Sequence, residues 1–197
     1  MTTCGYCDQR IGIAGRGRIR KFCSTRCRVA SHRKQTGLPS ELTSRDRWIR
    51  HRADKTPVTA AGLAASSTDP CTWTRYAAAA RSTVGTGLGF VLNGDGIVCI
   101  DIDHCLIDGA VSKWAQWIVD SCPHSYIEIS PSGDGLHIWG RGDVIKGRRI
   151  KVPGGTVEIY GTGRYITVTR RRHGACSSEL TDLSPVLTYL IASSPAA

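Results

Sequence analysis

Apolar residues between about residue 88 and residue 169 recur in short runs that favour β-strands. The runs are rich in Val, Ile, Tyr, Trp and Thr and are bounded by Gly, Asn, Asp, Ser and Pro. They cover residues 88–92, 97–103, 126–130, 136–139, 156–160 and 164–169. Turn residues that tolerate positive φ fill the gaps at 93–96, 131–135 and 161–163, so the pattern predicts three antiparallel hairpins.

Helical periodicity and capping residues predict helices between and around these strands. The expected helices cover residues 25–35, 69–81, 111–121 and 181–192, with a short basic helix within 45–55. Ser24 is the expected N-cap of the first helix, and Asp69 followed by Pro70 begins the second. Residues 146–151 read as a basic loop. Paired antiparallel strands with helices between them predict an α+β fold with a mostly antiparallel sheet.

The length and composition set the domain organisation that we expect. A chain of 197 residues, 41% of them hydrophobic, can form one medium domain and a small appendage. We predict a small module at 1–36, a basic linker at 37–55 and the main domain at 56–197. There is neither an apolar run of the ~18–20 residues that cross a bilayer nor a signal-peptide core, so no membrane association is expected. Nine cysteines, several of them in apolar contexts, indicate a reducing compartment.

Charge is distributed unevenly along the chain. Residues 1–55 hold 14 Lys/Arg and 4 Asp/Glu, a difference of +10, whereas residues 56–197 hold 12 of each. No amphipathic apolar face accompanies the basic segment, so the pattern favours nucleic acid over a membrane as its partner. The residues expected to contact nucleic acid are Arg26, Arg28, Arg33 and Lys34 in the first helix, and Arg148 and Arg149 further on. Solvated surface charge is the alternative for each of them.

Two cysteine pairs near the N-terminus have the spacing of metal ligands. Cys4 and Cys7 are followed, after fifteen residues, by Cys23 and Cys27. Each short loop lets two thiolates converge on one ion, so the spacing predicts a structural zinc (Zn²⁺) site in which the metal replaces a hydrophobic core. His32 is an alternative ligand. A disulfide knot is the other interpretation, but it conflicts with the missing secretion signal.

Carboxylates are placed within the most apolar strand. Asp101 and Asp103 end the run 97–103, and residues two apart in a strand face the same side, about 6.6 Å apart. Two such groups can bind one divalent metal ion or bridge two of them, as phosphoryl-transfer enzymes require. The alternative is that the strand simply ends there and the acids cap a turn.

Later strands add a histidine and a third acid. His137 follows the Gly-rich turn that contains Ser132, Gly133 and Gly135, whose backbone N–H groups could approach a phosphate closely. Glu158 lies at the centre of the run 156–160 and would complete an oxygen-rich shell for Mg²⁺ or Mn²⁺. Separately, His137 reads as a core histidine and Glu158 as a surface residue of an edge strand; together they favour a site.

The order of these motifs resembles the archaeo-eukaryotic primase superfamily, and more narrowly the bifunctional primase-polymerase domains of phages and mobile elements. Asp101-Ile102-Asp103 comes first, then Ser130 to His137 as a relaxed Ser-x-Gly-x-x-His, then the apolar-flanked Glu158. Further stretches similar to the phage group lie at 68–73, 89–92, 100–105 and 163–169. The resemblance covers about residues 52–175. Many members have Asp where this chain has Glu158, which bears on the choice between Mg²⁺ and Mn²⁺.

The resemblance implies an RRM-like catalytic sheet and two-metal addition of NTP or dNTP to a 3′-hydroxyl. It assigns the catalytic metals to Asp101, Asp103 and Glu158. It assigns the incoming nucleotide to the turn residues Ser132, Gly133 and Gly135 and to His137, and we add Arg164 as a phosphate contact. The implied partners are a single-stranded DNA template, nucleotides and a separate replicative helicase, in the cytoplasm of a bacterial host.

Two other functions compete with this interpretation. A non-catalytic zinc-ribbon module would bind nucleic acid and keep the acid cluster only as a vestige. A nucleotide-sugar transferase would use Asp-x-Asp for a metal ion but would leave the basic cysteine segment unexplained. Metal-dependent incorporation of a labelled nucleotide distinguishes a polymerase from both.

Overall fold

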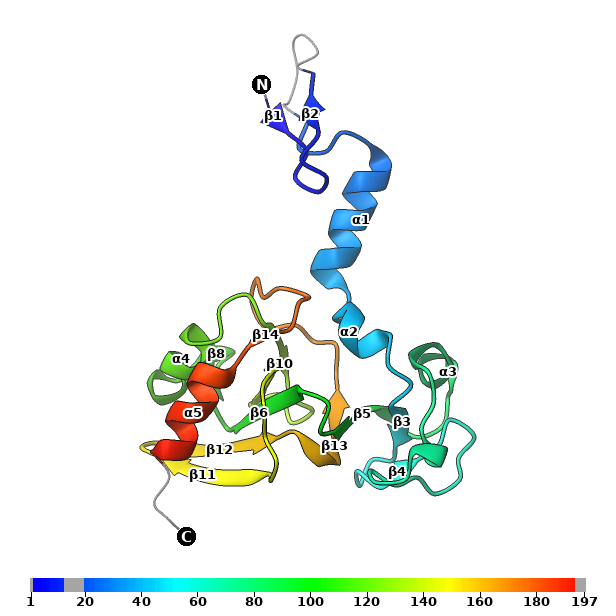
Figure 1. The fold of residues 1–197 in the computed structure, drawn as a ribbon, viewed down its shortest axis with the longest axis vertical. Coiled ribbons are helices and arrows are strands. Elements are labelled where there is room, and N and C mark those ends of the chain that lie inside the picture. Colours follow the sequence, from blue (N-terminus) through cyan, green and yellow to red (C-terminus); the bar gives the residue numbers. More distant parts are fainter. Residues whose placement is uncertain (1, 13–19, 194–197) are drawn as a thin grey trace. The chain divides into compact units, whose positions relative to one another are not determined.

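The computed structural model describes residues 2–12 and 20–193, without the side chains at positions 30 and 32–36. The chain divides into two compact units, Met1–Gly37 and Leu38–Ala197 (Figure 1). No helix of the described part is long and apolar enough to cross a membrane.

The N-terminal unit contains a two-stranded antiparallel ribbon and one helix. The ribbon pairs β1 (Thr2–Thr3) with β2 (Arg10–Ile11), and the helix is α1 (Thr25–Thr36). The backbone N–H of Cys27 donates to Ser24 Oγ at 3.1 Å, which satisfies one of the free N–H groups of the first turn. The predicted helix and its cap are confirmed.

The second unit is built on two sheets, and every pairing in them but one is antiparallel. The larger sheet has the strand order β11 (Arg148–Val152), β12 (Gly155–Tyr160), β6 (Ile97–Asp103), β10 (Leu136–Arg141) and β14 (Thr181–Asp182), with β9 (Tyr126–Ile129) also on β10. The smaller sheet has the order β13 (Thr162–Val168), β5 (Gly87–Asn93), β3 (Trp48–His51) and β4 (Pro57–Val58). The remaining elements are α2 (Ser40–Thr43), the 3₁₀ helix η1 (Pro70–Thr72), α3 (Tyr76–Arg81), β7 (Leu106–Ile107), β8 (Ala110–Val111), α4 (Lys113–Asp120) and α5 (Ser184–Ala192). The α+β class and the mostly antiparallel pairing are as predicted.

Strand β6 has a different hydrophobic environment on each face. Val98, Ile100 and Ile102 point into a core shared with α4 and α5, which cover that face of the larger sheet (Figure 1). Ile97 and Cys99 point the other way, into a core between the two sheets. Because side chains alternate along a strand, Asp101 and Asp103 continue the second series. The two carboxylates therefore face the space between the sheets.

The core between the sheets is centred on aromatic rings. Trp48 of β3 is fully buried, its ring centroid lies 5.1 Å from that of Phe90 in an edge-on arrangement, and its indole N–H donates to the Leu42 carbonyl at 3.0 Å. Phe90 in turn meets Trp139 of the larger sheet at 5.8 Å. This chain of rings joins the two sheets.

The segment 38–55 differs from our prediction. The expected basic helix within 45–55 is wrong, because Trp48 and Ile49 are fully buried and β3 pairs with β5 and β4. Charged residues on either side of two large apolar ones are the pattern of a short inner strand. Residues 38–55 thus belong to the second unit rather than to a linker.

Two of the three predicted hairpins are also wrong. The turn at 131–135 does join the paired strands β9 and β10. The turns at 93–96 and 161–163 instead carry the chain from one sheet to the other, since β5 pairs with β13 and β3 while β6 pairs with β10 and β12. Turn chemistry identifies where the chain reverses but not which sheet the next strand joins.

Smaller differences concern the helices and the basic loop. The helix predicted over 69–81 is split into η1, capped by Asp69, and α3, because Thr74 between them pairs with Trp48. The expected basic loop contains β11, and the last helix begins only at Ser184 because residues 181–182 form β14.

The position of Trp48 leads to a stability prediction. Trp48→Ala removes the ring that joins α2, β3 and β5, and we expect the free energy of unfolding to fall by about 3–5 kcal/mol. Urea denaturation followed by circular dichroism measures this free energy. Leu63→Ala is the control, because the Leu63 side chain is 71% exposed. A loss below about 1 kcal/mol would contradict this description of the core.

Candidate active site and metal centre

A row of charged side chains crosses five adjacent strands of the larger sheet. Asp101 on β6 is directly opposite Glu158 on β12 and His137 on β10. The row continues with Arg149 on β11, opposite Glu158, and with Glu128 on β9, opposite His137. Directly opposite residues of antiparallel strands share one face, so these five side chains lie side by side. Four predicted site residues, Asp101, His137, Arg149 and Glu158, are brought together here.

A cleft of about 640 Å³ opens over the centre of this row. Asp103 joins it from the end of β6, where His104, with φ of 50°, turns the chain away. The charged and hydroxyl side chains that line the cleft are Lys55, Ser67, Asp101, Asp103, His104, Ser130, Ser132, His137, Glu158, Tyr160, Arg164, Tyr165 and Thr167. Carboxylates and cationic groups thus face the same space, which suits a ligand that brings both metal ions and phosphates.

His137 is held between two acids. It is 3% exposed, its Nε2 lies 3.6 Å from Asp101 Oδ1, and its Nδ1 lies 3.5 Å from Glu128 Oε1. Burial by itself lowers the pKa of His137, but Glu128 and then Asp101 raise it above the usual value. Glu128 thus lies at one edge of the ring and Asp101 at the other edge, towards the cleft.

Glu128 is fully buried and saturated with donors. The Tyr126 hydroxyl donates to it at 3.1 Å, the Trp139 indole N–H at 3.3 Å and the Arg170 backbone N–H at 2.8 Å. A buried carboxylate needs such partners to offset the loss of water. Our sequence analysis missed Glu128, although an acid inside the apolar run 126–130 is the same signal that identified Asp101.

The carboxylates at the centre of the row favour a cation. Burial raises the pKa of Asp101. The neighbouring carboxylates of Asp103 and Glu158 raise it further, whereas His137 lowers it. Asp101 Oδ1 is buried without a hydrogen-bond partner. A divalent ion bound by oxygen ligands would satisfy that atom, so the donor set fits Mg²⁺ or Mn²⁺. Within the described residues only the cysteine cluster brings three or more ligand atoms within 4.8 Å of one another.

Glu158 contacts one residue of its own strand and one of β11. The Tyr160 hydroxyl donates to it, and Arg149 Nε lies 3.4 Å from its Oε1. Arg164 stacks on the Tyr160 ring with 4.4 Å between the guanidinium carbon and the ring centroid. Arg149, predicted as a nucleic-acid contact, thus also neutralises a candidate metal ligand, while Arg148 is exposed.

The Gly-rich turn contributes in a different way from the one expected. Ser132 lines the cleft, but neither Gly133 nor Gly135 is among its lining residues. Gly133 has φ of 94°, and a Cβ on Gly135 would lie 2.8 Å from the Ile102 carbonyl oxygen. The two glycines shape the turn and allow β10 to pass close to β6.

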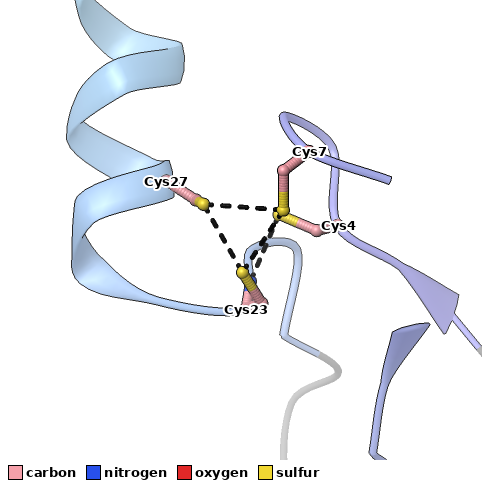
Figure 2. Close-up of side chains that lie close together, drawn as sticks. All are labelled: Cys4, Cys7, Cys23 and Cys27. Carbon is pink, nitrogen blue, oxygen red and sulfur yellow. Dashed lines mark hydrogen bonds between the residues drawn. The ribbon is translucent and has the colours of Figure 1, made fainter. Parts of the chain in front are cut away.

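The four predicted zinc ligands are close together in the N-terminal unit. Figure 2 shows Cys4 and Cys7 from the loop after β1, Cys23 before α1, and Cys27 in its first turn, all directed at one point. The sulfur atoms of Cys7, Cys23 and Cys27 are 3.4–3.7 Å apart. Tetrahedral zinc with bonds of about 2.3 Å would place them about 3.8 Å apart, so the cluster fits this ion.

The cysteines of the cluster also change one another's pKa. The backbone N–H of Cys23 donates to Cys4 Sγ at 3.3 Å and lowers the pKa of Cys4 to about 6. Contact with Cys27 and the other thiols raises the pKa of Cys23 to about 12, since negative charges at this distance repel. A bound cation would remove that repulsion.

The basic residues of the first helix are only partly described. Arg26 and Arg28 are exposed on α1. The side chains of Arg33, Lys34 and the alternative ligand His32 lie outside the described residues. Residues 1–37 as a unit hold nine Lys/Arg and one Asp, a difference of +8.

The second unit thus consists of two mainly antiparallel sheets with a cleft that carboxylates and cationic groups line. A four-cysteine cluster precedes it in the sequence. The chain is 41% identical over 132 residues to a DNA primase-polymerase of Nitratiruptor phage NrS-1. The match covers 62% of this chain but only 18% of that relative. No protein-family model matches the sequence.

The cysteine cluster leads to a prediction about metal content. We expect one zinc ion per chain, lost in the double variant Cys4→Ser with Cys23→Ser because two thiolates cannot complete a tetrahedral site. Elemental analysis after dialysis against a weak chelator measures it. Cys71→Ser, an exposed cysteine outside the cluster, is the matched control. Zinc retained by the double variant would refute the assignment.

The burial of Glu128 leads to a prediction about stability. Glu128→Ala leaves three hydrogen-bond donors without their acceptor and His137 without the acid beside it, and we expect the free energy of unfolding to fall by about 3–5 kcal/mol. The control is Glu41→Ala, which breaks an ion pair with Arg141 that is open to solvent and should cost at most about 1 kcal/mol. Equal effects of the two substitutions in urea denaturation would show that Glu128 is not a buried anchor.

Proposed function

We propose that this chain carries the active site of a template-directed nucleotidyltransferase, a DNA primase-polymerase that adds NTP or dNTP to a 3′-hydroxyl. The observation that carries the proposal is the row of Glu158, Asp101 and His137 across three paired strands inside a cleft. The 41% identity to a phage DNA primase-polymerase supports it. An RRM-like assignment of the larger sheet belongs to the same proposal.

Asp101, Asp103 and Glu158 would hold the catalytic divalent ions. Bound Mg²⁺ or Mn²⁺ would supply activation of the attacking hydroxyl and neutralisation of charge on the pyrophosphate. The protein provides the positions: two carboxylates on one face of β6 and a third on the neighbouring strand. Arg149 beside Glu158 limits the negative charge of the row when no nucleotide is present.

The cationic side of the cleft would bind the triphosphate. His137, Arg164 and Lys55 all line it, and Ser132 adds a hydroxyl from the turn. His137 is oriented by Glu128, so its Nε2 edge can donate a hydrogen bond towards a phosphate oxygen without a change of rotamer. Lys55, which belongs to the predicted linker 37–55, is a further candidate contact.

The N-terminal unit would bind single-stranded DNA through its excess positive charge. A difference of +8 within 37 residues supports this role, with zinc holding the cysteine loops in place. A separate replicative helicase as partner, and the cytoplasm of a bacterial host as the place of action, complete the proposal.

The carboxylates provide the experiment that tests the proposal. We expect Asp101→Asn or Asp103→Asn to reduce metal-dependent incorporation of labelled nucleotide at least ~100-fold, because each removes a charged metal ligand. Melting temperature should stay equal or rise, since buried like charges repel each other. His137→Ala should mainly raise KM for the nucleotide.

Asp120→Asn is the matched control, because Asp120 is exposed at the end of α4, on the helix-covered side of the larger sheet. Incorporation that persists in an Asp101, Asp103 double variant would refute the site. A parental chain that binds DNA but incorporates no nucleotide would favour the non-catalytic module instead.

A further inference from the structure

A second groove, of about 360 Å³, adjoins the acidic cleft and has no role in the function described so far. Pro131 and Thr167 line both spaces and form the boundary between them. The basic residues that line the second groove but not the cleft are Arg50 and His51 from β3 and Arg170 just after β13. No carboxylate is among its lining residues.

The two arginines of this groove have no acidic partner. Within the described residues, neither guanidinium has a carboxylate within 4.0 Å, whereas Arg47, Arg141 and Arg149 each do. Arg50 donates through Nε to the Val84 carbonyl at 2.6 Å. Burial, and then repulsion from Arg170, lower the pKa of Arg50. Two unpaired cationic groups close together favour an anion between them.

Arg170 is held in a costly backbone conformation. Its φ is 60°, a region that Gly or Asn enters more readily than Arg. The conformation directs its backbone N–H to Glu128 at 2.8 Å while its side chain lines the groove. Asn at this position would keep the backbone contact with less strain, so the guanidinium is the feature that Arg adds.

Aromatic rings connect the groove with the cleft. The ring of His51 covers Gly87 and that of Tyr165 covers Gly89, and a Cβ on either glycine would collide with the ring. The two ring centroids are 6.2 Å apart at an angle of 25°. His51 lines the groove and Tyr165 lines the cleft, so the stacked pair of rings reaches from one space to the other.

We propose that this groove binds single-stranded nucleic acid beside the nucleotide cleft, with Arg50 and Arg170 on a backbone phosphate and the His51 ring against a base. Unpaired arginines and exposed aromatic faces are the two features by which proteins bind single strands. The proposal rests on the proposed function, since it gives the cleft a neighbouring strand to copy or extend. The triphosphate would remain on the other side of Pro131 and Thr167.

Binding of a fluorescent oligo(dT) to the full chain, without divalent metal, tests the groove independently of catalysis. Arg170→Asn should weaken binding about tenfold at low salt and reduce the slope of log K against log salt by about 0.7, the value for one phosphate on a single strand. Arg170→Lys should keep the parental slope. Lys113→Asn, an equal charge change on the helix-covered side of the sheet, should change neither.

Two substitutions test the His51 ring. His51→Ala should weaken oligonucleotide binding by about five- to tenfold, whereas His51→Phe, which keeps a flat ring, should not weaken it. Melting temperatures verify that each variant is folded. If KM for the nucleotide on a saturating primer-template rises in Arg170→Asn while oligonucleotide affinity stays parental, the groove binds the triphosphate and the proposal is wrong.

Two further outcomes separate this inference from the proposed function. Parental affinity in both Arg170→Asn and His51→Ala overturns the groove even if the enzyme extends primers. A chain that incorporates no nucleotide, yet loses oligonucleotide affinity in these two variants alone, supports the groove and refutes the polymerase.

Discussion

The structure depends on the compensation of buried charge along one row of the larger sheet. Asp101 and Glu128 are largely or fully removed from water, and His137 lies between them. Neither acid is tolerable in that position without a cation or several donors. The row therefore fixes the registers of β6, β9, β10 and β12 as firmly as the apolar core does, because a slip of one residue would turn an acid into the opposite, apolar face.

The sequence pattern predicted six of the ten strands in the two sheets and the main acidic residues, but not the pairing of the strands. Alternating apolar residues and turn residues identify a strand whichever sheet it joins, so β6, β9, β10, β12 and β13 were all predicted. Whether β5 pairs with β6 or with β13 is decided by contacts between distant segments, which a local pattern does not contain. Trp48 shows the same limit of local patterns. Its charged neighbours favoured a basic helix, although Trp48 itself lies at the centre of the core.

The candidate site was predictable where its residues break a local rule. Asp101, Asp103 and Glu158 stand out as acids in apolar strands, and the four cysteines stand out by spacing. Glu128 breaks the same rule, yet without a second acid beside it the residue carried no recognisable motif. Lys55, Arg50 and Arg170 break no local rule, and only the folded chain shows that they line the cleft or the groove.

The Arg170 backbone has a consequence for how the two halves of the site communicate. One carboxylate, Glu128, accepts from the Arg170 N–H on one side and orients His137 on the other. Any force that an occupant of the groove exerts on residue 170 acts through a single buried group on the imidazole that faces the cleft. The two compartments thus share one buried carboxylate that contacts both of them.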